Sequence, residues 1–268
     1  MKAKIRELLR DIKAAALFGQ PEAIELALNS LRAIPAVAAN DRMSGSIIEQ
    51  VVLPAGQSLA RLESKYLRPL LDDPLAAIRA VGAVGLAHRF LLDKNATRKN
   101  LRRPGSDPRP DVRAALGRSL FEAWEANPER LLRLGTEWLA QPAPKLRHSA
   151  LIFIPALAPK YGQRIVDLLE PLGADKDREV RAAMVDSLKN LAGAGLAESV
   201  LGLLALWASA PRPNSWVVCR ALSGSWAALH PSEAKSILQE LQSKTGKTSD
   251  ISNALRALKR HGIEINLQ

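Results

Sequence analysis

A cluster of basic side chains is the clearest chemical signal in the sequence. Between Arg79 and Arg118 there are ten Lys and Arg residues against three acids, a net charge of +7 in a chain whose formal net charge is +11. Cationic groups concentrated in this way attract phosphate groups, and such binding weakens steeply with salt. The residues expected to contact nucleic acid or an acidic partner are Arg98, Lys99, Arg102, Arg103, Arg109 and Arg118.

Tryptophan is the second notable residue type, with five Trp against two Tyr and four Phe. Trp124, Trp138 and Trp207 continue apolar stripes at helical spacing, so we expect them in the core. Trp216 and Trp226 flank the segment 217–222, and we expect one of them to be half exposed, where an indole can stack on a base or a partner side chain. Trp216 therefore joins the candidate binding residues.

Catalytic chemistry has little support. The four histidines lie far apart and match no metal-ligand spacing, and the single cysteine, Cys219, forms neither an internal disulfide nor a zinc site by itself. Asp111 is the one weak catalytic candidate, and its place at an expected helix start explains it equally well. We expect no metal and no cofactor, and a binding protein in preference to an enzyme.

The elements that position these residues are indicated by an internal repeat. The segments 73–79, 107–113 and 175–181 share the pattern Asp, four residues, a β-branched aliphatic residue, then Arg. Their arginines lie 34 and 68 residues apart, and the segment 141–147 supplies the intervening copy, with Gln141 in place of Asp. A fixed period of this length is typical of stacked helix pairs, which cannot bury their apolar faces alone.

The composition supports the same architecture. The chain is 47% hydrophobic but only 4% aromatic, as suits helices packed closely through Ala, Leu and Val. We predict an all-α fold, a right-handed α-solenoid of about six or seven antiparallel helix pairs forming one domain over residues 1–268. Residues 1–71 are expected to be divergent capping pairs, 72–230 regular repeats and 231–268 a C-terminal cap.

The Asp-x4-[Val/Ile]-Arg turn resembles that of HEAT and HEAT-like repeats, which belong to the armadillo-like helical folds. This resemblance implies that the helix after each turn lines a concave face and that Asp and Arg side chains form a ladder between repeats. Arg79, Arg113, Arg147 and Arg181 would then be structural. The stretch 95–107 is expected to be either a short helix or a long basic loop.

A narrower similarity is to the bacterial alkylpurine DNA glycosylases built from HEAT-like repeats. It is carried by the segments 137–140, 146–151, 179–192, 203–207 and 214–222. The resemblance implies DNA repair by excision of a cationic base, with an Asp or Glu beside tryptophans, and Asp111 falls near that carboxylate. Pro108, Arg109 and Pro110 stand where paired tryptophans belong, which departs from the family pattern.

Three functions therefore remain open. The favoured one is a non-catalytic binding protein whose basic surface holds nucleic acid through the DNA backbone. The others are a protein–protein interaction scaffold for an acidic protein or peptide, and a glycosylase for alkylated bases. The charged N-terminus and the absence of a long apolar run favour a cytoplasmic protein without a membrane partner, and we expect a monomer.

Overall fold

The protein is all-helical over the residues that the structure describes. The computed structural model describes residues 2–19, 21–35, 43–93, 95–96 and 98–267, with the side chains of 2–4, 21–23 and 27 excepted. These residues contain helices, turns and loops and no strand, as the spacing of apolar residues predicts. The chain divides into two compact units, residues 1–153 and 154–268.

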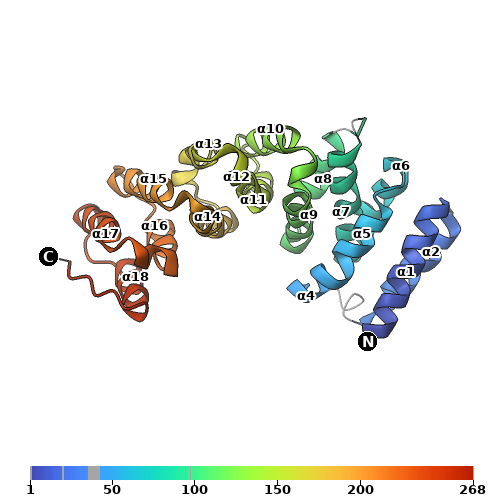
Figure 1. Cartoon of the computed structure of the whole chain (residues 1–268), viewed down its shortest axis with the longest axis horizontal. Helices are drawn as coiled ribbons and strands as arrows, with labels where there is room; N and C mark the ends of the chain where they lie inside the picture. The colour runs from blue at the N-terminus through green and yellow to red at the C-terminus, as the bar shows by residue number, and fades with distance from the viewer. Residues whose placement is uncertain (1, 20, 36–42, 94, 97, 268) are drawn as a thin grey trace. The chain divides into compact units, whose positions relative to one another are not determined.

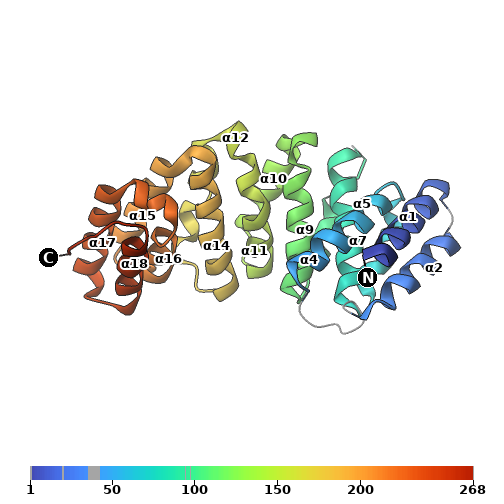
Figure 2. The same cartoon turned by 60° about the horizontal axis from the view of Figure 1, so that its bottom comes forward.

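Unit 1 consists of helices that pack on their neighbours along the chain (Figures 1 and 2). Helices α5, α7, α9 and α11 form one row in which each contacts the next, and α1 packs on both α2 and α5. The helices of this unit are α1 (Lys2–Phe18), α2 (Pro21–Arg32), α4 (Gly45–Ile47), α5 (Leu53–Leu59), α6 (Ser64–Leu67), α7 (Ala76–Leu92), α8 (Lys99–Gly105), α9 (Pro110–Glu122), α10 (Pro128–Leu139) and α11 (Pro144–Phe153).

Unit 2 has two rows of helices (Figure 1). One row is α14, α16 and α18, and the other is α13, α15 and α17, with consecutive members in contact within each row. The helices of this unit are α12 (Ala158–Tyr161), α13 (Gln163–Asp167), α14 (Arg178–Leu191), α15 (Ala197–Ser209), α16 (Ser215–Leu222), α17 (Pro231–Thr245) and α18 (Ser249–Arg260).

The repeated aspartates shape the turns before the helices. The Oδ1 atoms of Asp73, Asp107 and Asp175 each accept a hydrogen bond from the backbone N–H two residues later, at 2.9, 2.8 and 2.9 Å. A hydrogen bond from a backbone N–H to the Asp side chain two residues earlier stabilises the turn, and the helix begins directly after it. The three aspartates thus form the same turn directly before α7, α9 and α14.

The repeated arginines make a recurring contact. In three successive copies the guanidinium Nη1 donates to the backbone carbonyl six residues earlier: Arg79 to Asp73 at 2.9 Å, Arg113 to Asp107 at 2.6 Å, and Arg147 to Gln141 at 2.8 Å. The contact recurs at the 34-residue spacing because each copy places its Arg in the first turns of a helix, six residues after the same position of the preceding turn. Gln141 stands where the other copies have Asp, and the arginine contact is still made because its acceptor is a backbone oxygen.

Two of the repeat aspartates also form ion pairs with arginines that lie earlier in the chain. Asp107 is bound by Arg79 Nε at 2.8 Å, and Asp73 by Arg32 Nη2 at 2.7 Å. These pairs are largely buried, so breaking one by removing a single partner leaves a charge without compensation. Arg79–Asp107 joins the Arg of one copy to the Asp of the next, whereas Arg32 lies outside the repeat pattern.

One helical stretch, Arg178–Ser209, is long and apolar enough by length and composition to cross a membrane. It comprises α14, the π-helical segment Ala192–Leu196 and α15. Helices α14 and α15 contact each other, and the backbone kinks at Gly195, where φ is 90°. Such a φ is strained for residues with a side chain, and glycine adopts it freely. Since an apolar helix pair of a protein core meets the same criterion, the stretch is weak evidence for a membrane span.

Candidate functional site

The predicted basic cluster of unit 1 lies on and around helix α8, and the stretch 95–107 thus contains a short helix. Lys94 and Thr97 lie outside the described residues. Four of the six candidate cations have carboxylate partners. The pairs and their N–O contacts are Arg98–Glu137 at 2.7 Å, Arg103–Asp72 at 3.0 Å, Arg109–Asp111 at 3.4 Å and Arg118–Glu49 at 2.6 Å.

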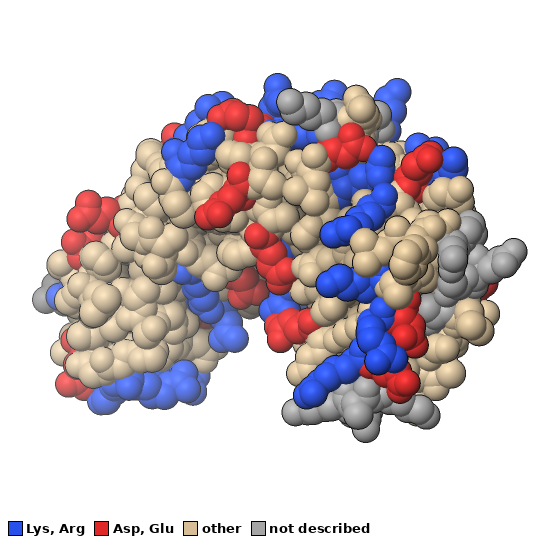
Figure 3. All heavy atoms as spheres, turned by 45° about the vertical axis from the view of Figure 1, so that its right-hand side comes forward, with Lys and Arg blue, Asp and Glu red and all other residues tan. Residues whose placement is uncertain are grey.

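These ion pairs reduce the field that a phosphate backbone would meet. At several places on the surface seen in Figure 3, Lys and Arg side chains stand beside Asp and Glu. The hydrogen bonds from the Arg103 guanidinium hold the pKa of the Asp72 carboxyl below its ordinary value, so Asp72 stays charged and the pair is neutral overall. Lys99 and Arg102 are exposed and have no ion pair with any described residue. The predicted cluster therefore offers two uncompensated cations.

Asp111 lies in the first turn of α9, where the sequence places it, but its carboxylate is buried. Its Oδ2 accepts a hydrogen bond from the backbone N–H of Met43 at 3.1 Å and contacts Arg109 Nη2 at 3.4 Å. The carboxylate therefore ties a distant segment to the helix start. These contacts with Met43 and Arg109 give the Asp111 carboxylate a structural role.

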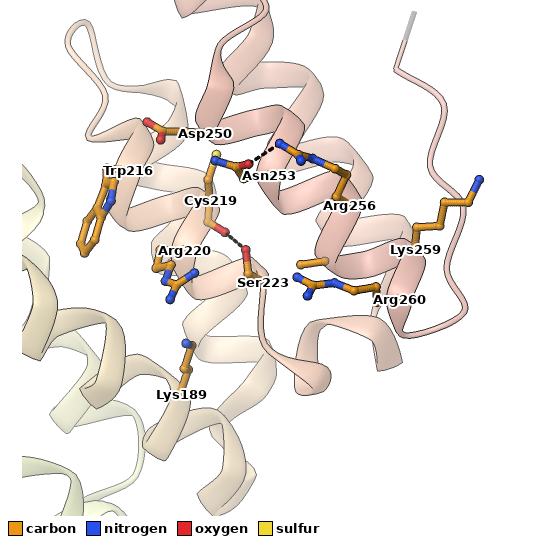
Figure 4. A pocket seen from close by; sticks show the side chains of 11 residues that line it. Lys189, Trp216, Cys219, Arg220, Ser223, Asp250, Asn253, Arg256, Lys259 and Arg260 are labelled. Atoms are coloured by element: carbon orange, nitrogen blue, oxygen red, sulfur yellow. Dashed lines mark hydrogen bonds between the residues drawn. The ribbon is translucent and has the colours of Figure 1, made fainter.

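A cavity of unit 2 lies on the row formed by α14, α16 and α18 (Figure 4). It is an open pocket of about 1130 Å³. We call it the α16–α18 pocket, and its lining residues are Lys189, Trp216, Cys219, Arg220, Ser223, Asp250, Asn253, Arg256, Ala257, Lys259 and Arg260.

The α16–α18 pocket is strongly cationic, with five basic side chains against one acid, Asp250. Within the described part of the chain, Lys189, Arg220 and Arg260 form no ion pair. Arg256 donates only to neutral groups, the side-chain oxygen of Asn253 at 2.6 Å and the carbonyl of Ser252 at 3.4 Å. Four positive charges are thus left without an acidic partner.

Lys259 is the fifth basic residue of the pocket, and it differs from the other four. Its ammonium group pairs with Glu264 at 2.7 Å, and hydrogen bonding to that carboxylate raises the pKa of Lys259 above its ordinary value. Both side chains are exposed, so water screens the pair and it stabilises the fold little. Lys259 contributes less to an anion site than its four neighbours.

Trp216 lies at the edge of this pocket and is 37% exposed. The Arg181 guanidinium lies over its ring, 5.7 Å from the ring centroid, in the geometry of a cation–π contact. The expectation that Trp216 or Trp226 is half exposed is therefore confirmed for Trp216. Trp138 and Trp207 are buried as predicted, whereas Trp124 is half-buried in the turn after α9.

Cys219 has the wrong chemistry for a nucleophile, although it lines the pocket. Burial, with a smaller contribution from the charge of Asp250, raises the pKa of the Cys219 thiol to about 12. The thiol is therefore protonated at neutral pH, and the thiolate is the reactive form. No group of His, Cys, Asp and Glu within the described ranges is arranged to hold a metal ion.

The sequence predicted one residue of this pocket, Trp216, and missed the cations. The signal was present: Arg220 follows Trp216 by one helical turn, and Arg256, Lys259 and Arg260 share the C-terminal end of one amphipathic helix. Counting charges along the chain favoured residues 79–118 because it ignored the acids that the fold brings from other segments.

The described residues thus form an all-helical protein with a cationic pocket that has a tryptophan at its edge. Comparison with known protein families gives no match, and comparison with curated proteins gives none either. The chemistry of the pocket is therefore the basis for assigning a function.

Proposed function

We propose that this protein is a non-catalytic, cytoplasmic binding protein, built as a HEAT-like helical solenoid, that holds DNA through its phosphate backbone. Two features support the solenoid. The arginine contact recurs at 34-residue spacing in unit 1, and alternate helices stack into rows in both units. Repeats of this kind bury their apolar faces on neighbouring repeats and leave an extended surface for a ligand.

The observation that carries the binding proposal is the uncompensated charge of the α16–α18 pocket. Lys189, Arg220, Arg256 and Arg260 have no acidic partner among the described residues. Like charges held close together repel one another, and bound phosphates relieve that repulsion while releasing counterions from the nucleic acid. Arginine is suited to this task because its planar guanidinium forms paired hydrogen bonds to phosphate oxygens.

A base-excision activity needs a carboxylate open to the substrate. The Asp111 carboxylate is buried and engaged with Met43 and Arg109, so the structure offers no support for Asp111 as that group. An acidic protein partner would use the same cations, and it is an outcome of the test below.

Binding of a labelled 20-base-pair duplex, measured by fluorescence anisotropy over a range of salt, tests the proposal. Four backbone contacts give a log–log slope of about −3.6, or roughly 150-fold weaker binding at about 200 mM than at about 50 mM salt. The variant Arg220→Ala/Arg260→Ala removes two contacts, so its slope becomes about −1.8 and the loss over this range roughly 12-fold.

A matched control is Arg164→Ala/Lys235→Ala, which removes the same charge from exposed positions of unit 2 outside the pocket. It is expected to keep the wild-type slope to within about 0.5, since only contacted phosphates release counterions. Equal slopes for the two double variants would contradict the assignment of the pocket. Failure of the wild-type protein to bind at the lower salt, with an acidic protein recovered after nuclease treatment, would favour the scaffold function instead.

A further inference from the structure

We propose that the α16–α18 pocket selects nucleic acid with unpaired bases: one base stacks on Trp216 while the adjoining phosphates lie against Arg220, Lys189 and Arg260. This inference rests on the proposed function and adds the form of the ligand. Backbone contacts alone serve single and double strands alike, whereas an exposed aromatic ring distinguishes them.

Trp216 and its cationic neighbours have the arrangement that a nucleotide requires. Trp216 and Arg220 are four residues apart on α16, so their side chains are neighbours on one face of the helix. Figure 4 shows the indole of Trp216 beside this helix, with the Arg220 guanidinium next to it and Lys189 beyond. A base on the indole would thus place its own phosphate within reach of Arg220.

The Trp216 ring is held in place and only partly covered. Helix α16 buries its apolar residues Val217, Val218 and Leu222, but it leaves Trp216 37% exposed. The guanidinium of Arg181, from α14, lies over the ring, which restrains its rotation. An indole already ordered in this way loses little conformational entropy when a base stacks on it.

The dimensions of the pocket favour a polymer over a small molecule. Its volume of about 1130 Å³ exceeds the roughly 300–1,000 Å³ of typical small-ligand sites, and it is open to solvent. Its cations come from three helices, α14, α16 and α18, and so are spread along the pocket. This distribution suits consecutive phosphates of a strand better than one compact anion.

Asp250 distinguishes a base from an acidic peptide. It is the one carboxylate that lines the pocket, and Figure 4 shows it at the same end as Trp216. A peptide carboxylate beside Asp250 would be repelled, whereas an N–H group of an unpaired base, such as N3–H of thymine, can donate a hydrogen bond to it. The pocket thus has an aromatic end with a hydrogen-bond acceptor and a cationic end.

A regular duplex cannot use this end of the pocket. Its bases are stacked on one another, so their faces are closed to a protein side chain except at the ends of the helix. In a single strand every base presents a π-face, and stacking on an aromatic side chain tightens binding by about 5- to 150-fold per base. Single strands should therefore bind more tightly than duplexes with the same number of nucleotides per strand.

The experiment compares a labelled 12-nucleotide oligothymidylate with its duplex on oligodeoxyadenylate at equal salt. For wild-type protein the single strand is expected to bind at least about 5-fold more tightly. Trp216→Ala should weaken single-strand binding by about 5- to 150-fold and change duplex binding by less than about twofold. The matched control is Phe121→Ala in unit 1, which removes an aromatic ring of similar exposure, 38%, and should change neither.

A second readout does not depend on the alanine variant folding. Oligothymidylate should quench the tryptophan fluorescence of the wild-type protein, and the quenching should be lost in Trp216→Phe, which keeps a ring for stacking but lacks the indole signal. Equal quenching in the two proteins would overturn the inference.

The outcomes separate this inference from the proposed function. If Trp216→Ala leaves single-strand binding unchanged while Arg220→Ala/Arg260→Ala weakens both ligands, base stacking is excluded and backbone binding stands. If wild-type protein binds neither ligand at low salt, both proposals fail.

Discussion

Replacing Asp111 tests whether this buried carboxylate has a structural role. In Asp111→Ala the backbone N–H of Met43 loses its acceptor, and Arg109 loses a carboxylate contact. A buried N–H left without a partner costs about 1–3 kcal/mol, and an acidic group in the first turn of a helix stabilises it by about 0.3–1 kcal/mol. We therefore expect the free energy of unfolding to fall by about 1–4 kcal/mol.

The assay is thermal unfolding followed by circular dichroism. For a unit of this size each kcal/mol lowers Tm by about 2–4 °C, so Asp111→Ala should melt roughly 2–16 °C lower. Asp111→Asn keeps an oxygen that can accept from Met43 and should cost only about 1 kcal/mol. The control Glu198→Ala removes an exposed acid from the first turn of α15 and should cost no more than about 1 kcal/mol.

Two results would refute this explanation of Asp111. One is a Tm for Asp111→Ala within about 1 °C of the wild type, against the shift expected from the lost bonds. The other is release of an alkylated purine base from DNA by the wild type and not by Asp111→Asn, which would make Asp111 catalytic.

Three further predictions concern the packing and the buried titratable groups. In Gly56→Ala the new Cβ would lie 2.5 Å from Val84 Cβ, so thermal unfolding should show a loss of about 1–3 kcal/mol, whereas Gly202→Ala, with open space around it, should gain up to about 1 kcal/mol. Cys219 should resist thiol reagents at pH 8 in the folded protein and react in denaturant. Because folding raises the pKa of its thiol to about 12, the thiol of the unfolded chain loses its proton at lower pH. The free energy of unfolding should therefore fall as pH rises above about 9. Burial lowers the pKa of His88, whose Nε2 has no partner among the described residues, so stability should fall as pH decreases below about 6.5, and His88→Leu should remove this dependence in urea titrations at pH 5 and 7.

The helical class and the turn chemistry could be predicted from the sequence because both are local. The Asp-x4-aliphatic-Arg pattern contains the turn acceptor and the donor of the recurring contact, so three copies indicated the geometry of Asp73, Asp107 and Asp175. The N-terminal 71 residues lack the Asp-x4-aliphatic-Arg pattern, so their sequence does not predict the ion pair between Arg32 and Asp73.

The site was harder to predict because it depends on charges brought together by folding. Arg98 and Arg118 belong to the most basic stretch, yet Glu137 and Glu49 neutralise them from distant segments. Arg220 and Arg260 lie in stretches of modest charge, and they form a cationic pocket because α16 packs on α18. Trp216 could be singled out from the sequence because it stands directly before the apolar segment 217–222, and its indole is partly exposed in the structure.

Photocrosslinking tests most directly whether the α16–α18 pocket is the binding site. An oligonucleotide carrying 5-iodouracil, irradiated in complex with the wild-type protein and analysed by mass spectrometry, identifies the peptides that lie against the bases. We predict crosslinks to Trp216 and to peptides of α16 and α18. Crosslinks confined to the stretch 98–118 of unit 1, with none on α16 or α18, would contradict the assignment of the site.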